Sequence, residues 1–230
     1  APLPPEACKQ FEEKTGAIIF EGYGLSETAP IATANPSFTD TRKIGSIGFP
    51  VPGTDIKILD AETSQTEMPR GEDGEVAICG PQVMQGYWNK PDETAEVFRE
   101  IDGRRFFLTG DIGHVDDDGY VVITDRKKDM ILVGGFNVYP REVEDILFTH
   151  PKVALAAVVG VPDAKSGEAV KAFIQLKPGE TCTEAEIREF CKSNMAGYKR
   201  PKNIAFRDSI PVSNVGKVLR RVLRDEERRN

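Results

Sequence analysis

Histidine and cysteine are scarce in this sequence of 230 residues, which has two histidines and four cysteines. The cysteines are Cys8, Cys79, Cys182 and Cys191, and they form no CxxC pair. Their positions also show none of the spacings that are typical of metal ligands, which argues against a zinc site. We therefore predict reduced thiols and a cytoplasmic location.

Long apolar runs and an excess of positive charge are missing as well. No run approaches the roughly 20 apolar residues that a membrane span needs. Acidic residues outnumber basic ones by 37 to 30, for a net charge of −7, which argues against a general nucleic-acid binder. The first residues lack an initiator methionine and the basic and apolar regions of a signal peptide, and we expect a fragment of a longer protein.

What the sequence does contain is sufficient for a packed core, since 39% of its residues are apolar and 29% are charged. Residues 5–15 have the pattern of a helix that begins on proline and ends at Gly16. The short apolar run 17–20 predicts a buried strand. Residues 21–30 are rich in glycine and hydroxyl groups and predict no regular element.

From about residue 44 to residue 125, short strands alternate with glycine and proline. Strands are predicted over residues 55–59, 75–79, 106–108, 112–115 and 120–124. A hairpin turn at 116–119 resembles the start of a calcium loop but lacks the glutamate that such a loop needs further on. These elements predict a small all-β unit, in the form of a distorted barrel.

The remaining residues predict a compact α+β module that follows a polar segment, 126–129, which is a candidate hinge. Strand patterns cover residues 130–133, 153–161, 170–176 and 204–206, and helix patterns cover 140–149 and 217–229. A third helix is expected to open at Thr183, where Glu186 completes a capping box.

The segment EGYGLSET, residues 21–28, combines groups that suit a nucleotide. Its glycines let a backbone approach a ligand, and Tyr23 offers a flat ring for a base. Ser26 and Thr28 offer hydroxyls, and Glu27 offers a hard oxygen ligand for Mg²⁺. The alternative is a surface loop of mixed composition.

Four further positions have both a functional and a structural interpretation. Asp111 could accept hydrogen bonds from a ribose diol, or could be a turn aspartate. Arg126 could bind phosphate or ribose oxygens, or could belong to a solvated charge run. The pair Gly134 and Gly135 could admit a ligand or form a turn. Lys217 could carry an ammonium group into a site, and its poor fit to a helix start mildly favours that role.

Six segments in this order resemble the adenylate-forming (AMP-binding) enzymes, which include acyl-CoA synthetases, aryl-CoA ligases, luciferases and peptide-synthetase adenylation domains. They are GYGLSET (22–28), GEVAICGPQVMQGYWNKP (74–91), TGD (109–111), DRKKDMILVGGFNVYPREVED (125–145), GYKRPK (197–202) and SNVGKVLRR (213–221). The last three segments most resemble those of bacterial long-chain fatty acyl-CoA synthetases.

The resemblance implies two half-reactions with ATP, Mg²⁺ and CoA. A carboxylate and ATP give an acyl-adenylate and pyrophosphate, and the CoA thiol then displaces AMP. Positive charge must lie between the two anionic reactants of the first step, and a mobile module can bring a lysine in for that step alone.

The resemblance also implies a mixed fold in which this chain is the C-terminal part of a synthetase. Residues 1–43 would be a remnant of a large N-terminal α/β domain that carries the nucleotide loop, and residues 44–125 the barrel-like subdomain. The segment 126–129 would be the hinge, and residues 130–230 the mobile C-terminal domain.

Roles in the first half-reaction follow from the same resemblance. Glu27 matches the acidic Mg²⁺ ligand, and Ser26 matches a position, usually threonine, whose hydroxyl meets the α-phosphate. Glu21, Gly22 and Tyr23 match the segment against the adenine.

Other nucleotide-binding positions come from later motifs. Asp111 matches the carboxylate that holds the ribose hydroxyls, and Arg126 its neighbour on the ribose. Asn137 is counted among the nucleotide-binding positions. Lys217 matches the catalytic lysine of adenylation.

The resemblance places the second half-reaction in the C-terminal domain. Gly134 and Gly135 match the loop that lines the CoA channel, and Lys128 matches the hinge position. Leu132 stands where aryl-CoA ligases tend to have a lysine, which weakens the aryl interpretation. The family's Gly/Ser/Thr-rich phosphate loop has no match here, so the chain alone is predicted to be inactive.

The predicted parent protein is an ATP-dependent long-chain fatty acid–CoA ligase. A medium-chain or aryl acid–CoA ligase and a non-catalytic folded module are the alternatives. The predicted partners are fatty acid, ATP and CoA, without nucleic acid. The basic residues of the terminal helix could contact anionic lipid at the inner membrane, but its acidic residues favour a solvated helix.

Overall fold

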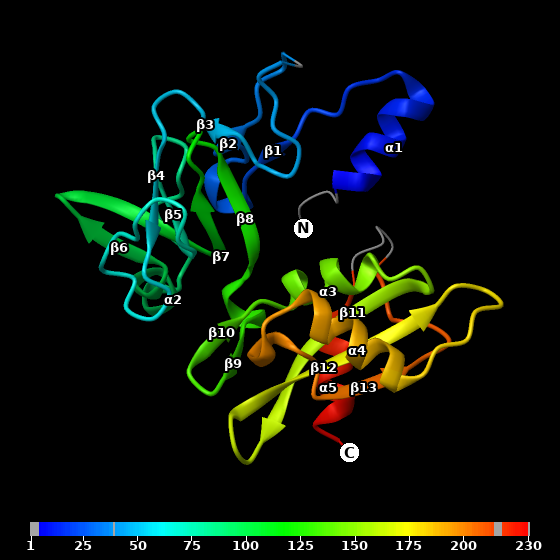
Figure 1. Cartoon of the computed structure of the whole chain (residues 1–230). Coiled ribbons are helices and arrows are strands. Elements are labelled where there is room, and N and C mark those ends of the chain that lie inside the picture. Colours follow the sequence, from blue (N-terminus) through cyan, green and yellow to red (C-terminus); the bar gives the residue numbers. More distant parts are fainter. Residues whose placement is uncertain (1–4, 39, 214–217, 230) are drawn as a thin grey trace. The chain divides into compact units, whose positions relative to one another are not determined.

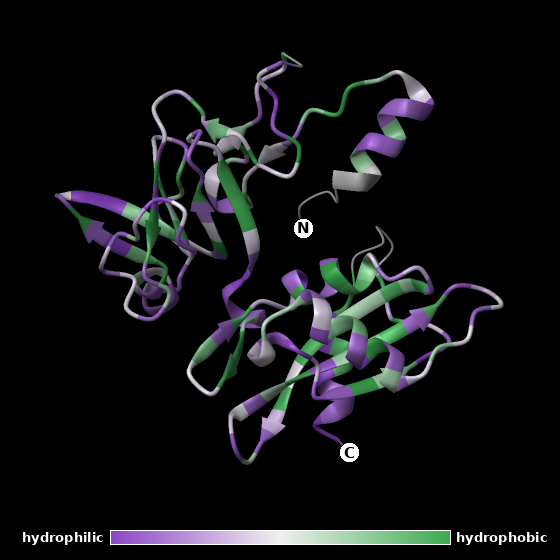
Figure 2. Ribbon diagram, in the orientation of Figure 1, coloured by the Kyte–Doolittle hydropathy of each residue, from purple (hydrophilic) through white to green (hydrophobic). Residues whose placement is uncertain are grey.

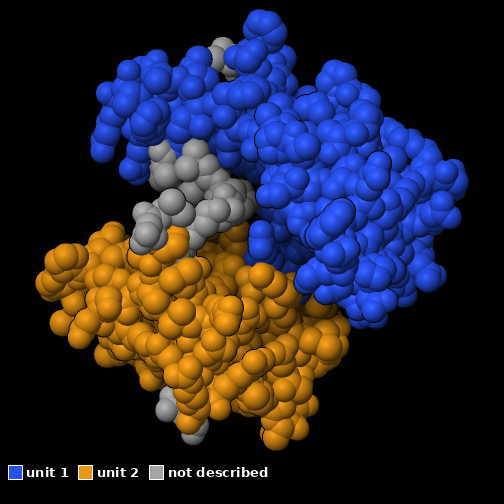
Figure 3. All heavy atoms as spheres, turned by 180° about the vertical axis from the view of Figure 1, so that it is seen from behind, with its two compact units in different colours: residues 1–127 blue, residues 128–230 orange. Residues whose placement is uncertain are grey.

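The computed structural model describes residues 5–38, 40–213 and 218–229. The chain divides into two compact units, residues 1–127 and 128–230, which Figure 3 distinguishes by colour. Within the described residues, no helix is both long and apolar enough to cross a membrane. Each unit is described by itself below, with the element labels of Figure 1.

Unit 1 begins with helix α1, Pro5–Thr15, which confirms the predicted range. The strand predicted over residues 17–20 is wrong, because Ile18 and Phe20 are 53% and 55% exposed and the segment has no strand partner. Polar side chains bind this backbone instead: Glu12 accepts a hydrogen bond from the Ile19 amide at 2.8 Å, and Arg42 donates one to the Ile19 carbonyl at 2.7 Å. The apolar run is therefore held by an ion pair rather than by a sheet.

A small antiparallel sheet follows, in which β2 (Thr33–Ala34) lies between β1 (Gly22–Tyr23) and β3 (Phe49–Pro50). The connection from β1 to β2 contains the single 3-10 turn η1, Ser26–Thr28. β1 and η1 lie within residues 21–30, for which no regular element was predicted.

The larger sheet of unit 1 has five antiparallel strands. They are β4 (Asp55–Leu59), β5 (Gly74–Cys79), β6 (Phe98–Ile101), β7 (Arg104–Val115) and β8 (Val121–Arg126). The order is β4-β5-β7-β6, and β8 also pairs with β7. Helix α2, Pro91–Glu96, precedes β6, and the predicted turn at 116–119 connects β7 to β8.

The distorted barrel predicted for residues 44–125 is not found, because among the described strands the sheet stays open. The two strands predicted at 106–108 and 112–115 are one continuous strand, β7. One edge of β7 pairs with β5, and its other edge is shared, with β6 on its first half and β8 on its second half. The strands β4, β6 and β8 end the sheet without pairing with one another.

In its described residues, unit 2 contains a mixed sheet and three helices. Its strands are β9 (Ile131–Val133), β10 (Phe136–Val138), β11 (Val153–Asp163), β12 (Gly167–Leu176) and β13 (Asn203–Phe206). The order is β10-β9-β12-β11, and β13 pairs with β12 in parallel. The helices are α3 (Pro140–Phe148), α4 (Glu184–Asn194) and α5 (Arg220–Glu227), and the 3-10 turns are η2 (Lys127–Asp129) and η3 (Gly197–Lys199). The capping box predicted at Thr183 and Glu186 is confirmed at the start of α4.

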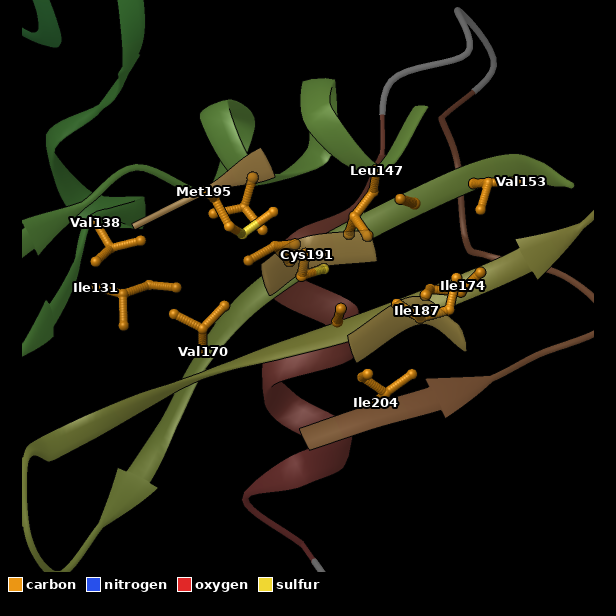
Figure 4. Close-up of a cluster of buried hydrophobic side chains, with 14 residues drawn as sticks. Ile131, Val138, Leu147, Val153, Val170, Ile174, Ile187, Cys191, Met195 and Ile204 are labelled. Atoms are coloured by element: carbon orange, nitrogen blue, oxygen red, sulfur yellow. The ribbon is translucent and has the colours of Figure 1, made fainter. Parts of the chain in front are cut away.

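The sheet of unit 2 buries both faces because β11 and β12 alternate apolar side chains in both directions. Ala156 and Val158 join a cluster that contains Ile187 of α4, drawn in Figure 4. Ala157 and Val159 point into a second cluster that contains Leu223 of α5. Figure 2 shows hydrophobic residues along both strands. The helices therefore cover opposite faces of this sheet.

A charge network fastens α5 to the rest of unit 2. Glu144 of α3 is only 6% exposed, and its carboxylate accepts hydrogen bonds from the Val158 amide at 2.8 Å and from Arg220 Nε at 2.9 Å. Arg220 and Arg224 also reach Asp129, with Arg224 Nη2 2.8 Å from Asp129 Oδ1. Two arginines of the terminal helix are thus used for internal contacts.

Replacing Arg220 by methionine is expected to destabilise unit 2 by about 3 kcal/mol, because it leaves the carboxylate of Glu144 buried without its cation. Native-state hydrogen exchange at the core amides of β11 and β12 measures this free energy. Arg221→Met on the same helix is the control, since Arg221 is 90% exposed, and its effect should stay within about 0.5 kcal/mol. Equal effects of the two substitutions would contradict the assignment.

Candidate functional site

The segment that connects β1 to β2 is a tight loop closed by a buried hydroxyl. Thr28 is fully buried, and its Oγ1 accepts a hydrogen bond from the Leu25 amide at 2.9 Å and lies 2.9 Å from the Pro30 carbonyl oxygen. A Cβ at Gly24 would lie 1.5 Å from that same Pro30 oxygen, so only glycine fits there. This closure presents Ser26 at the surface and leaves Glu27 half-buried.

Glu27 lines a cavity of about 260 Å³ within unit 1. Its Oε1 accepts a hydrogen bond from the Tyr87 hydroxyl at 3.0 Å, and its Oε2 has no hydrogen-bond partner among the described residues. Burial, followed by the bond to Glu27, raises the pKa of Tyr87, which keeps this hydroxyl a donor. A carboxylate that lines a cavity and has one oxygen without a hydrogen-bond partner fits a hard cation such as Mg²⁺. The described residues contain no cluster of three or more acidic, histidine or cysteine side chains around a metal position.

Asp111 is the buried carboxylate of the site, with 6% of the residue exposed. Its Oδ2 accepts a hydrogen bond from the Tyr23 hydroxyl at 2.7 Å, and its Oδ1 lies 3.2 Å from Arg126 Nε. Asp111 and Arg126 are opposite each other in the pairing of β7 with β8. Strand register therefore brings together two residues that are 15 positions apart, and the loop adds Tyr23 from much further away.

The hydroxyl of Tyr23 remains a donor over a wide pH range. Burial, and then the negative charge of Asp111, raise the pKa of Tyr23 well above its ordinary value near 10. Because the proton stays on the phenol, Asp111 stays oriented by a neutral hydrogen bond on one side and by the guanidinium of Arg126 on the other.

A second buried carboxylate, that of Glu75 in β5, contacts the backbone next to Asp111. Glu75 Oε1 accepts a hydrogen bond from the Gly110 amide at 3.2 Å, next to Asp111. Its Oε2 lies 2.7 Å from Lys127 Nζ and also accepts a hydrogen bond from Ser64 Oγ at 3.0 Å. These contacts hold residues Thr109 and Gly110 of β7, which immediately precede Asp111.

Three residues of this site were missed from the sequence, namely Glu75, Lys127 and Tyr87. The available signal was an acidic residue inside the apolar pattern of strand 75–79, since a carboxylate is seldom buried without a partner. Tyr87 and Lys127 lie in segments rich in glycine and charge, where no local pattern singles them out.

The remaining predicted positions are distributed as follows. Glu21, directly before β1, is half-buried, and Gly22, the first residue of β1, is exposed. In unit 2, Gly134 and Gly135 form the two-residue turn between β9 and β10, with φ values of 58° and 87°, so the turn requires both glycines. Asn137 is exposed on β10.

Two predicted residues concern the hinge and the adenylation step. Lys128 is exposed, and its carbonyl accepts a hydrogen bond from Arg224 at 3.0 Å. Lys217 lies outside the described residues. The structure thus brings Tyr23, Asp111 and Arg126 into direct contact and places Glu27 on the neighbouring cavity.

Comparison with known families agrees with this arrangement of motifs. Residues 1–88 match the AMP-binding enzyme family, and residues 142–217 match the AMP-binding enzyme C-terminal domain. The chain belongs to the AMP-binding enzymes.

Two relatives and one solved structure show how similar this chain is to individual proteins. The chain is 48% identical over 227 residues to a long-chain-fatty-acid–CoA ligase of Escherichia coli O6:H1, covering 99% of this chain and 39% of the relative. It is 49% identical over 230 residues to a long-chain-fatty-acid–CoA ligase of Bacillus subtilis, of which it covers 40%. Among solved structures, ATP-bound MatB from Rhodopseudomonas palustris has a TM-score of 0.90 at 40% identity, covering 98% of this chain and 44% of that chain. This chain thus spans well under half the length of these proteins.

Gly24→Ala is expected to destabilise the β1–β2 loop by about 2–3 kcal/mol, because the added methyl group meets backbone that cannot move independently. The opening free energy of the β2 and β3 amides in native-state hydrogen exchange measures this. Gly22→Ala is the control, since a Cβ there would lie 3.6 Å from the Thr33 oxygen, an ordinary contact. An unaltered free energy in Gly24→Ala would show that the close approach is wrong.

Tyrosine ionisation can be followed by the absorbance of tyrosinate as pH rises. We expect folded Tyr23→Phe and the folded original chain to show the same absorbance change up to about pH 11, because Tyr23 does not ionise there. Above pH 10 the unfolded chain loses the Tyr23 proton while the folded chain keeps it, so Tyr23 makes the folded state less stable as pH rises. In denaturant, the original chain should titrate one more tyrosine than the variant. If the folded variant showed an absorbance change smaller by one tyrosine than that of the folded original chain in this pH range, the raised pKa of Tyr23 would be wrong.

Proposed function

We propose that this chain is the C-terminal portion of an AMP-forming long-chain fatty acid–CoA ligase, in which residues 1–43 are the end of a larger N-terminal α/β domain. The reaction converts a carboxylate and ATP to an acyl-adenylate and pyrophosphate, and then transfers the acyl group to CoA with release of AMP. The observation that carries the proposal is the Tyr23–Asp111–Arg126 cluster, in which a buried carboxylate of one motif is held by one residue from each of two other motifs. The identity of 47–49% with long-chain-fatty-acid–CoA ligases supports the substrate class.

The cluster suits a ribose diol. Each carboxylate oxygen of Asp111 can accept a second hydrogen bond, and two neighbouring hydroxyls of a ribose can donate to them in the manner known from dinucleotide sites. Arg126, with 55% of its side chain exposed, retains N–H groups for the same sugar. Tyr23, Gly22 and Glu21 form the strand end against which the adenine would lie.

The loop provides the phosphate and metal contacts. Glu27 would hold Mg²⁺ through the oxygen that Tyr87 does not bind, and the metal would supply positive charge to the phosphate oxygens. The exposed hydroxyl of Ser26, one residue earlier, would donate a hydrogen bond to the α-phosphate. The bond from Tyr87 orients the Glu27 carboxylate before any ligand arrives.

Unit 2 would serve the two half-reactions in turn. Lys217 would stabilise the charge that develops on the phosphoryl oxygens while the acyl-adenylate forms. Rotation about Lys128 would then withdraw Lys217 and bring the Gly134–Gly135 turn to the CoA thiol. Asn137, on the strand after that turn, would contact the nucleotide. A Cβ at either glycine would meet no atom within 4 Å, which leaves space for a ligand chain beside the turn.

An aryl acid is the second candidate substrate. A feruloyl-CoA synthase of Amycolatopsis is 40% identical over 220 residues, covering 96% of this chain and 43% of that relative. The higher identity to the long-chain ligases and the apolar, half-exposed Leu132 favour a fatty acid. We propose a cytoplasmic enzyme with a solvated terminal helix, since two of its arginines are taken up by Asp129 and Glu144.

The complete protein should release AMP in the presence of ATP, Mg²⁺ and CoA, with the highest rate for long-chain acids in a panel from acetate to oleate that includes a cinnamate. Lys217→Ala should lower the rate on the order of 100-fold or more, because one electrostatic contact to the developing charge is lost. Lys192→Ala is the control, since this side chain is 65% exposed on α4. The 230-residue chain alone should form no thioester.

Different results would overturn different parts of the proposal. Activity confined to short or aromatic acids would contradict the substrate class while keeping the reaction. Absence of activity with every acid would favour a non-catalytic module. Thioester formation by the 230-residue chain would show that the missing portion is not required.

A further inference from the structure

The residue before Lys128 is anchored in unit 1 by an ion pair whose carboxylate is buried. Lys127 Nζ lies 2.7 Å from Glu75 Oε2, and the Glu75 side chain is only 4% exposed. The same carboxylate accepts hydrogen bonds from Ser64 Oγ at 3.0 Å and from the Gly110 amide at 3.2 Å. The end of unit 1 is therefore tied to the strand that carries Asp111.

The residue after Lys128 is anchored in unit 2 by a second set of charges. Asp129 Oδ1 lies 2.8 Å from Arg224 Nη2, and its Oδ2 lies 3.5 Å from Arg220 Nη1. Only 12% of the Asp129 side chain is exposed. Arg224 also donates a hydrogen bond to the Lys128 carbonyl oxygen at 3.0 Å. This oxygen is therefore the first backbone atom after Lys127 that unit 2 binds.

These two anchors leave few backbone torsions free between the units. Lys127 is held through its side chain to unit 1, and the carbonyl of Lys128 is held to unit 2. The bonds left between the two anchors are the ψ torsion of Lys127 and the φ and ψ torsions of Lys128. A hinge needs a small number of torsions that absorb the whole change, with rigid attachments on both sides.

We propose that Glu75 and Lys127 are a positioning pair that ends unit 1 at residue 127 and so confines the rotation of unit 2 to the backbone of Lys128. This inference rests on the proposed function, in which unit 2 turns between the two half-reactions. The pair also connects the hinge to the nucleotide cluster, because the carboxylate that holds Lys127 also holds the Gly110 amide beside Asp111.

An ion pair suits this purpose better than an apolar contact. Burying a carboxylate and an ammonium contributes little net stability, because desolvation offsets their attraction. It does select one geometry, since only one placement of the ammonium satisfies the buried carboxylate. A hydrophobic side chain at position 127 could occupy several positions against the sheet. The backbone of residue 127, which leads into the proposed hinge, would then have no fixed position.

Two variants test the pair in the 230-residue chain by amide hydrogen exchange. Glu75→Gln keeps an acceptor for the Gly110 amide but removes the buried charge. The double variant Glu75→Gln with Lys127→Met removes both charges, so that no carboxylate is left buried without a cation. Both should accelerate exchange at residues 127–129 on the order of tenfold and leave β5 and β7 unaltered. Glu67→Gln is the matched control, because it removes the exposed partner of Lys57 in the same unit.

The proposal would be overturned if both variants exchanged the amides of residues 127–129 at the same rate as the original chain. Faster exchange spread evenly over β5 and β7 would overturn it as well, since the pair would then stabilise the sheet rather than position the hinge.

In the complete protein, the same variants should lower kcat on the order of tenfold and leave the KM for ATP unaltered, because the nucleotide cluster keeps its contacts while unit 2 loses its defined path. A raised KM for ATP with unaltered kcat would overturn the hinge role. If the unsubstituted complete protein forms no acyl-adenylate, the proposed function fails, and the exchange experiment still decides whether the pair anchors residue 127.

Discussion

A carboxylate that leaves water must be met by cations or N–H groups, and this requirement shapes both units of the chain. Glu75 and Asp111 in unit 1 and Glu144 in unit 2 are each at most 6% exposed. Each is surrounded by donors from distant segments, and these donors determine where strand ends, turns and the terminal helix lie. Removal of one donor therefore costs more than the loss of a single contact.

The same requirement produces a site that is organised before a ligand arrives. Asp111 is held by Tyr23 and Arg126, and Glu27 by Tyr87, so the oxygens that would meet sugar and metal have fixed positions. Preorganised groups of this kind stabilise developing charge without having to reorient during a reaction. The closed loop at Gly24 serves this purpose, because the Thr28 hydroxyl holds the backbone next to Glu27 in place.

Local signals predicted local structure well. Helix α1 and the capping box at Thr183 follow from proline, glycine and hydroxyl positions within a few residues, and the motifs placed Glu27 and Asp111 among the candidates for the same reason. The strand at 17–20 and the barrel were wrong because they depend on distant partners, namely Arg42 in one case and the shared edge of β7 in the other. Glu75 was missed because its contacts to Gly110 and Lys127 span 35 and 52 positions.

The contacts on the two sides of Lys128 also differ in when they can form during synthesis of the chain. Glu75 precedes Lys127, so this pair is available as soon as unit 1 leaves the ribosome. Asp129 must wait for Arg224, which is 95 positions later. Because domains fold in order as they emerge, the proposed hinge would be anchored on one side only until α5 is made. Synthesis of the arginines of α5 would thus be the step that completes the anchoring of unit 2.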